Sequence, residues 1–172
     1  DQLADLRSRQ IGFIFQTFNL LPVLSAAENV EYPLLHRKDV SSEERHRRVK
    51  YFLEMVGLER FADHRPNQMS GGQRQRVASA RALAGHPAIG LADEPTANLD
   101  KATGTEILQL MKEINEKMGT TFIFSTHDQR VIDMANRLIR VEDGRVIAIG
   151  KREKGEWMIQ SDLGGVFIDV EP

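Results

Sequence analysis

The sequence contains no cysteine among its 172 residues. This absence excludes disulfides, thiolate catalysis and cysteine-ligated zinc, and it fits a reducing compartment. The sequence also lacks an apolar run near the roughly 20 residues that span a bilayer, and residues 1–10 lack the apolar segment of a signal peptide. Any membrane association is therefore expected to go through a partner.

An excess of charge of either sign is also missing. The chain has 23 Lys and Arg against 25 Asp and Glu, a formal net charge of -2. We therefore expect no attraction of the whole chain to nucleic acid or to anionic lipid. Partner choice is expected to depend on local sites.

The pattern G-x-x-x-x-G-K-[ST] is also absent. This loop holds nucleotide phosphates with its main-chain amides and its lysine. It occurs nowhere in the 172 residues, yet residues 69–100, MSGGQRQRVASARALAGHPAIGLADEPTANLD, join a glycine-opened helix to an apolar strand that ends in two carboxylates. The sequence thus carries one half of a site for phosphate chemistry.

Apolar patterning predicts strands that alternate with helices. Short apolar runs predict strands at residues 10–16, 88–92 and 121–125, and Asp143-Gly144 predicts a hairpin turn between two further strands. The continuous apolar run at 88–92 is typical of a parallel sheet covered on both faces. We therefore expect an α/β fold with a parallel sheet and an antiparallel edge.

Helices are predicted by capping signals and by apolar residues at helical spacing. Capping boxes are predicted at Ser25 with Glu28 and at Ser41 with Glu44. The predicted helices after the first box span residues 42–56, 72–85, 103–118 and 131–135.

The order of these elements predicts the domain organisation. Residues 1–16 and 86–150 form the sheet core, and residues 17–85, almost all helical, form an inserted subdomain. Residues 151–172 are interpreted as a tail, in which residues 166–170 alternate as a strand does.

Two adjacent carboxylates, Asp93 and Glu94, follow the apolar strand at 88–92. Ligands of open α/β sheets bind beyond the carboxyl ends of the strands. Successive residues that leave a strand point in different directions, so one carboxylate can hold a metal while the other addresses a water. The alternative is a solvated turn. The residues that follow at 95–100, PTANLD, disfavour this interpretation.

Ser70, Gly71, Gly72 and Gln73 begin the helix before that strand. Glycines at a positive helix end expose main-chain amides, which favours an anion site. The alternative is an ordinary capping box of Ser70 with Gln73. We interpret the spaced arginines of this helix as mostly a solvated face; they are Arg74, Arg76 and Arg81.

Gln16 and His127 each end a predicted strand at the same edge of the sheet. Alone, His127 has the alternative of capping the next helix, and Gln16 is unremarkable. The other four histidines lie in polar surroundings without the spacing of metal ligands, and no function is assigned to them.

Together these segments resemble the ATP-binding subunits of ABC transporters. Residues 69–73, MSGGQ, resemble the signature motif with methionine in place of the usual leucine, and residues 89–94, IGLADE, resemble the Walker B strand. Gln16 matches the Q-loop, Asp100 the D-loop and His127 the switch histidine. The residues of these segments are most similar to those of the subgroup that serves lipoprotein release and macrolide export.

The resemblance implies a P-loop NTPase (RecA-like) parallel sheet core with an inserted helical subdomain, here truncated at the N-terminus. It implies ATP and Mg²⁺ held between the P-loop of one subunit and the signature of a second, head to tail. The partners it implies are that second nucleotide-binding subunit and a membrane-spanning permease at the cytoplasmic face, with no nucleic acid.

The resemblance also implies roles for single residues. Asp93 would position Mg²⁺, and Gln16 would sense both the metal and the attacking water. Glu94 would polarise that water, and His127 would contact the γ-phosphate. Glu94, His127 and Gln16 would thus be the catalytic residues. The residues that would bind the ATP of the other subunit are Ser70, Gly71, Gly72 and Gln73. Asp100 would lie at the dimer seam.

The chain differs from the family because the segment before the Q-loop strand is missing. In the family this segment contains the P-loop and the aromatic residue that usually stacks on adenine. Loss of one preorganised donor to a transition-state oxyanion costs about 10²–10³ in rate, and a P-loop supplies several, so we expect no measurable hydrolysis by this chain alone. We also expect unpaired sheet edges. Two alternatives stay open: a catalytically silent ABC-type binding module, and an ABC ATPase that acts outside transport.

Overall fold

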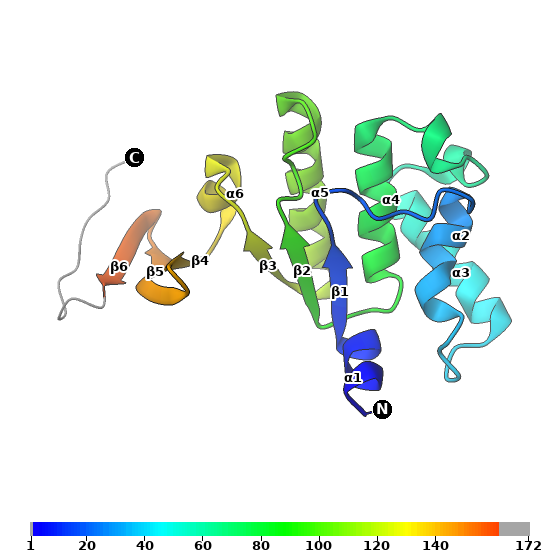
Figure 1. Cartoon of the computed structure of the whole chain (residues 1–172), viewed down its shortest axis with the longest axis horizontal. Coiled ribbons are helices and arrows are strands. Elements are labelled where there is room, and N and C mark those ends of the chain that lie inside the picture. The colour runs from blue at the N-terminus through cyan, green and yellow to red at the C-terminus, as the bar shows by residue number, and fades with distance from the viewer. Residues whose placement is uncertain (1, 162–172) are drawn as a thin grey trace. The chain divides into compact units, whose positions relative to one another are not determined.

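Three parallel strands form the sheet at the centre of the first part of the chain (Figure 1). The computed structural model describes residues 2–161. Strands β1 (Ile11–Ile14), β2 (Ile89–Asp93) and β3 (Thr121–Ser125) pair in the order β1-β2-β3. The predicted α/β class is confirmed. Gln10 is not part of a strand, because it ends an unpredicted helix, α1 (Gln2–Gln10).

One face of this sheet packs on the helices α4 (Gly71–Leu83) and α5 (Lys101–Met118). Ile14 and Ala92 from the strands are buried with Ile107 and Met111 of α5. Helix α4 comes closest at Gly12, where an added Cβ would lie 2.3 Å from the carbonyl oxygen of Ala82. The missing side chain therefore allows the helix to lie directly on β1.

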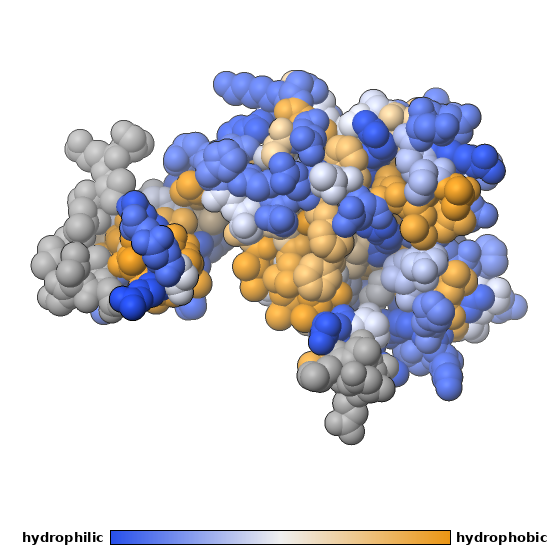
Figure 2. Space-filling view, viewed as in Figure 1, coloured by the Kyte–Doolittle hydropathy of each residue, from blue (hydrophilic) through white to orange (hydrophobic). Residues whose placement is uncertain are grey.

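The opposite face of the sheet carries exposed apolar side chains. Phe13, Leu91 and Ile123 are paired across the three strands, and Phe13 and Ile123 are 42% and 53% exposed. Figure 2 shows hydrophobic surface over these strands. The prediction that both faces of the sheet are covered is wrong for the described residues, because α4 and α5 both pack on the side of Gly12.

A helical block lies between β1 and β2 in the sequence. Its helices α2 (Ala26–Glu31) and α3 (Ser42–Met55) share with α4 a buried core that includes Val30, Phe52 and Val77. Three short 3₁₀ turns connect its helices: η1 (Tyr32–Leu34), η2 (Glu59–Phe61) and η3 (Pro66–Gln68). The division of the chain at residues 17 and 85 stays a prediction.

The two predicted capping boxes differ in the structure. Ser25 and Glu28 form both hydrogen bonds of the box at the start of α2. Ser41 caps α3, but the carboxylate of Glu44 accepts from the guanidinium of Arg48 at 2.7 Å and does not complete the box. A basic side chain one turn further along the helix competes for that carboxylate.

The described residues divide into two compact units, and the second comprises residues 127–161. It contains α6 (Gln129–Met134) and an antiparallel sheet of β4 (Arg137–Glu142), β5 (Arg145–Glu153) and β6 (Glu156–Ser161). Asp143 and Gly144 have φ of 49° and 74°, which confirms the predicted hairpin turn.

We expected the antiparallel strands to form an edge of the parallel sheet. They form a sheet of their own instead. A tight turn determines which strands pair and says nothing about the sheet they join. Strand β6 was not predicted, although Lys154-Gly155 with φ of 53° and 94° forms its turn. The strand predicted at 166–170 lies outside the described residues. Across the part of the chain that is described, no helix combines the length and apolarity needed to cross a bilayer.

Candidate functional site

Asp93 and Glu94 lie at the carboxyl ends of β2 and β3. Asp93 is exposed and is the last residue of β2, opposite Ser125 of β3. Glu94 has a φ of 41°, a left-handed conformation that costs a residue with a Cβ about 1–2 kcal/mol. Its amide donates to the carbonyl oxygen of Ser125 at 2.9 Å, and its carboxylate accepts from the hydroxyl of Thr126 at 3.0 Å. The backbone thus holds the second carboxylate beside the end of β3.

Ser70 and Gln73 form a complete capping box at the start of α4. The Ser70 hydroxyl accepts from the Gln73 amide at 3.2 Å, and the Gln73 side-chain oxygen accepts from the Ser70 amide at 2.9 Å. The capping alternative raised for this segment is therefore present in the structure. Binding of another subunit's nucleotide by the same residues stays a prediction.

Gly72 also has a packing role. A Cβ added at Gly72 would lie 2.4 Å from the Cγ2 methyl of Thr103 in α5, and the Thr103 hydroxyl is held by the carboxylate of Asp100 at 2.6 Å. A Cβ added at Gly71 would lie 3.5 Å from Leu99, an ordinary contact. Only Gly72 is required for the close approach of α4 to the first turn of α5.

Asp100 caps helix α5. Its carboxylate accepts from the amide of Thr103 at 3.0 Å as well as from the hydroxyl. These two hydrogen bonds, that of the hydroxyl first, hold the pKa of Asp100 below its ordinary value. Asp100 therefore stabilises the fold as a carboxylate, and its place at a dimer seam stays a prediction.

Gln16 follows β1 in an exposed turn. Its main-chain oxygen accepts from the side-chain amide of Asn98 at 2.9 Å, which joins this turn to the segment between Glu94 and Asp100. Two consecutive residues after Gln16 have left-handed conformations, Phe18 with a φ of 64° and Asn19 with 48°. Asn98 and Thr126 are contact residues of this site that the sequence did not single out, although both are polar and lie close to a strand end.

The interpretation of the α4 arginines as a solvated face is wrong. Arg81 donates to the carbonyl oxygens of Phe18 and Asn19 at 2.9 and 2.5 Å, and burial lowers the pKa of its guanidinium. Arg76 donates to the carbonyl oxygen of Val56 at 3.2 Å and to Glu106. Long basic side chains bury their stems on apolar surface and reach polar groups of neighbouring segments. Helical spacing alone does not reveal this.

The donors expected for Mg²⁺ are present without forming a closed metal cage. Within residues 2–161, no three His, Asp or Glu side chains gather as a metal site. Mg²⁺ is usually bound through one or two carboxylates together with substrate phosphates, so an exposed Asp93 suits it. His127 is the first residue of the second unit, and its predicted approach to Asp93 stays a prediction.

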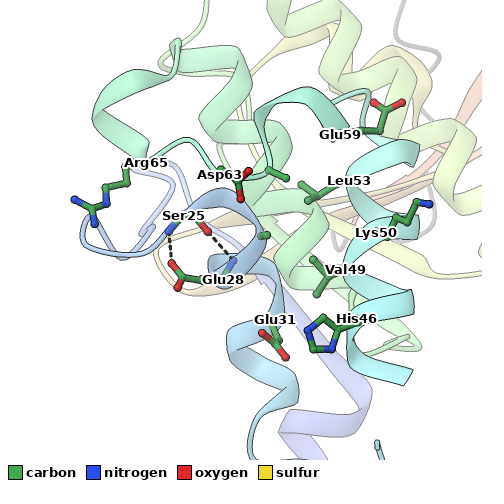
Figure 3. Close-up of a pocket in the computed structure, with 12 residues that line it drawn as sticks. Ser25, Glu28, Glu31, His46, Val49, Lys50, Leu53, Glu59, Asp63 and Arg65 are labelled. Carbon is green, nitrogen blue, oxygen red and sulfur yellow. Dashed lines mark hydrogen bonds between the residues drawn. The ribbon is translucent and has the colours of Figure 1, made fainter. Parts of the chain in front are cut away.

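A groove of about 590 Å³ lies between α2 and α3 (Figure 3). The Ser25 and Glu28 capping box lies on one wall, and Val49 and Leu53 of α3 line the other. The groove contains none of the predicted site residues. The site is therefore the edge formed by the ends of β1, β2 and β3 with the start of α4.

Comparison with known proteins identifies the family. The family model described as ABC transporter matches residues 2–97. An uncharacterized ABC transporter ATP-binding protein of Thermotoga maritima is 52% identical over 151 residues, which are 88% of this chain and 64% of the relative. The macrolide export ATP-binding/permease protein MacB of Syntrophobacter fumaroxidans is 49% identical over 84% of this chain and 20% of its own length.

Solved structures agree with this result. The ATP-binding cassette MJ0796 in a dimeric, post-hydrolysis state bound to ADP and Pi superposes with a TM-score of 0.76 at 51% identity, over 88% of this chain and 66% of that one. The chain spans 63% of the length of the curated MJ0796 protein of Methanocaldococcus jannaschii. The fold is thus that of ABC ATPase cassettes, and with a family model that matches more than half of its residues the chain belongs to the ABC transporter family of ATP-binding proteins.

Proposed function

We propose that this chain is the larger part of an ATP-hydrolysing subunit of a transporter, and that a P-loop before residue 1 completes its own nucleotide site. The chain with that preceding segment is called the full-length subunit below. The observation that carries the proposal is the pair Asp93 and Glu94 at the carboxyl end of β2, with the Glu94 carboxylate 3.0 Å from the hydroxyl of Thr126, which follows β3.

The roles of the two carboxylates follow from their surroundings. Asp93 is exposed at the end of β2, where with Gln16 it would hold Mg²⁺. Mg²⁺, when bound, supplies positive charge beside the phosphates. Glu94 is half-buried and oriented by Thr126, so it is suited to polarise a water. His127 would contact the γ-phosphate of the same nucleotide.

The signature residues serve a second subunit in this proposal. Ser70, Gly71, Gly72 and Gln73 stand at the positive end of α4, a helix of 13 residues, and would bind a nucleotide that another subunit holds in its P-loop. Asp100 would lie at the interface between the two subunits. The dimeric structures of the MJ0796 cassette support a dimer, which we propose to be head to tail.

Transport requires a membrane-spanning partner. The MacB relatives are named ATP-binding/permease proteins, which supports a permease as that partner. We propose that the subunit lies peripherally at the cytoplasmic face of the membrane.

Phosphate release tests the proposal. The full-length subunit is expected to hydrolyse ATP with Mg²⁺ and to stop when EDTA removes the metal. The 172-residue chain alone is expected to release no measurable phosphate, because loss of even one preorganised donor costs about 10²–10³ in rate and a P-loop supplies several. Turnover by the chain alone at the full-length rate would contradict the divided site, and an inactive full-length subunit would favour a silent binding module.

A further inference from the structure

The turn after Gln16 has a conformation that is unfavourable for Phe18. Phe18 and Asn19 are consecutive left-handed residues with φ of 64° and 48°, and neither is a glycine. Left-handed backbone costs free energy for a bulky residue such as Phe18, whereas Asn tolerates it better than most residues. Such conformations persist where the surrounding structure holds them, and they cluster at functional sites.

Arg81 of α4 holds the main chain of this turn. Its two terminal nitrogens donate to the carbonyl oxygens of Phe18 and Asn19 at 2.9 and 2.5 Å. The planar guanidinium presents its donors as a rigid fork, so it fits two carbonyls that the left-handed turn brings together. A lysine carries its three donors on one nitrogen at the end of a flexible stem, so it lacks the two separated nitrogens that donate to the two carbonyls here.

Two further contacts hold the turn. The guanidinium carbon of Arg74 lies 5.1 Å from the centre of the Phe18 ring, a cation–π contact. Arg74 and Arg81 lie on the same side of α4, because seven residues make about two helical turns. On the Gln16 side, Asn98 donates to the Gln16 carbonyl oxygen at 2.9 Å.

We propose that Arg81 is a positioning residue for Gln16. By holding the Phe18–Asn19 turn, it ties the position of Gln16 to helix α4, which begins at the signature residues Ser70 to Gln73. A nucleotide seated at the start of α4 thereby influences Gln16 through one rigid helix. This inference rests on the proposed function, because Gln16 holds Mg²⁺ there together with Asp93.

Hydrogen exchange in the full-length subunit tests the hold on the turn. The amides of Phe18 and Asn19 donate to the carbonyl oxygens of Phe15 and Thr17 at 3.1 and 2.7 Å, so they report directly on its conformation. Arg81→Lys is expected to speed their exchange about tenfold, the loss of one charged hydrogen bond. Arg76→Lys is the matched control, because Arg76 is also an arginine of α4 that donates to a main-chain carbonyl, that of Val56, away from the turn. This control should leave the exchange of the Phe18 and Asn19 amides unchanged. Equal exchange in Arg81→Lys and the wild type would overturn the proposal.

Steady-state kinetics test the link to Gln16. Arg81→Lys is expected to lower kcat about tenfold with the KM for ATP nearly unchanged, and to have no further effect in a Gln16→Ala background, because residues that act through one another are not additive. A full tenfold loss in that background would overturn the positioning role. If the wild-type full-length subunit has no ATPase activity, the proposed function fails, while the exchange measurement still decides whether Arg81 holds the turn.

Discussion

Glu94→Gln in the full-length subunit is expected to lower kcat for ATP hydrolysis by about 10²–10⁴, the contribution of a positioned general base. The glutamine retains an acceptor for the Thr126 hydroxyl, which lies 3.0 Å from the wild-type carboxylate, so the local fold should persist. Because Asp93 is unchanged, metal and nucleotide binding should survive. ATP-bound dimers should therefore accumulate, which phosphate release and gel filtration with Mg²⁺ and ATP would detect.

Glu106→Gln is the matched control for this variant. Glu106 lies on α5, pairs with Arg76 and has a side chain that is 64% exposed, so its change to an amide should leave kcat unchanged. Turnover of the Glu94→Gln subunit near the wild-type rate would remove Glu94 from the proposed chemistry.

Gly12→Ala is expected to lower the free energy of unfolding by about 3 kcal/mol, the upper part of the usual range for overpacking. The new Cβ would lie 2.3 Å from the carbonyl oxygen of Ala82, so α4 would have to move off β1. Main-chain atoms cannot rotate away as a flexible side chain can. Urea unfolding followed by circular dichroism measures the change.

Gly85→Ala is the control for the stability measurement. A Cβ added at Gly85, just after α4, has no neighbour closer than 3.7 Å, so the free energy of unfolding should change by less than about 0.5 kcal/mol. A Gly12→Ala variant as stable as the Gly85→Ala variant would show that α4 does not lie on β1 as described.

The local elements were predictable because they follow from side-chain periodicity. The apolar run at residues 121–125 became β3 with the same bounds. Gly57 and Gly119, with φ of 68° and 71°, follow α3 and α5. A left-handed helix end favours glycine for steric reasons that act within a few residues. No distant contact is needed to foresee it.

Features that depend on distant contacts were not predictable in this way. Arg81 lies more than 60 positions from Phe18 in the sequence, and nothing in the spacing of the α4 arginines points to the turn that it holds. The exposed row of Phe13 and Ile123 is another case, because an apolar strand has the same pattern whether or not its second face is covered.

In the candidate site, too, local features were predictable and features that depend on distant contacts were not. The position of Asp93 and Glu94 at a strand end was predictable from the apolar run before them. The left-handed conformation of Glu94 and its bond to Thr126 were not, because both depend on the neighbouring strand β3. The capping box of Ser70 with Gln73 was foreseen as an alternative, and it is present beside whatever role these residues have in nucleotide binding.

Sedimentation velocity tests most directly whether the site is divided between two subunits. The 172-residue chain offers a signature without a P-loop, so it is mixed with the full-length Glu94→Gln subunit, whose P-loop retains ATP. The 172-residue chain carries a fluorescent label so that its own sedimentation is followed apart from dimers of the Glu94→Gln subunit. Mg²⁺ and ATP together are expected to move the label into a faster-sedimenting heterodimer that is absent with ADP or with EDTA. A sedimentation profile that is the same with and without ATP would contradict the division of the site.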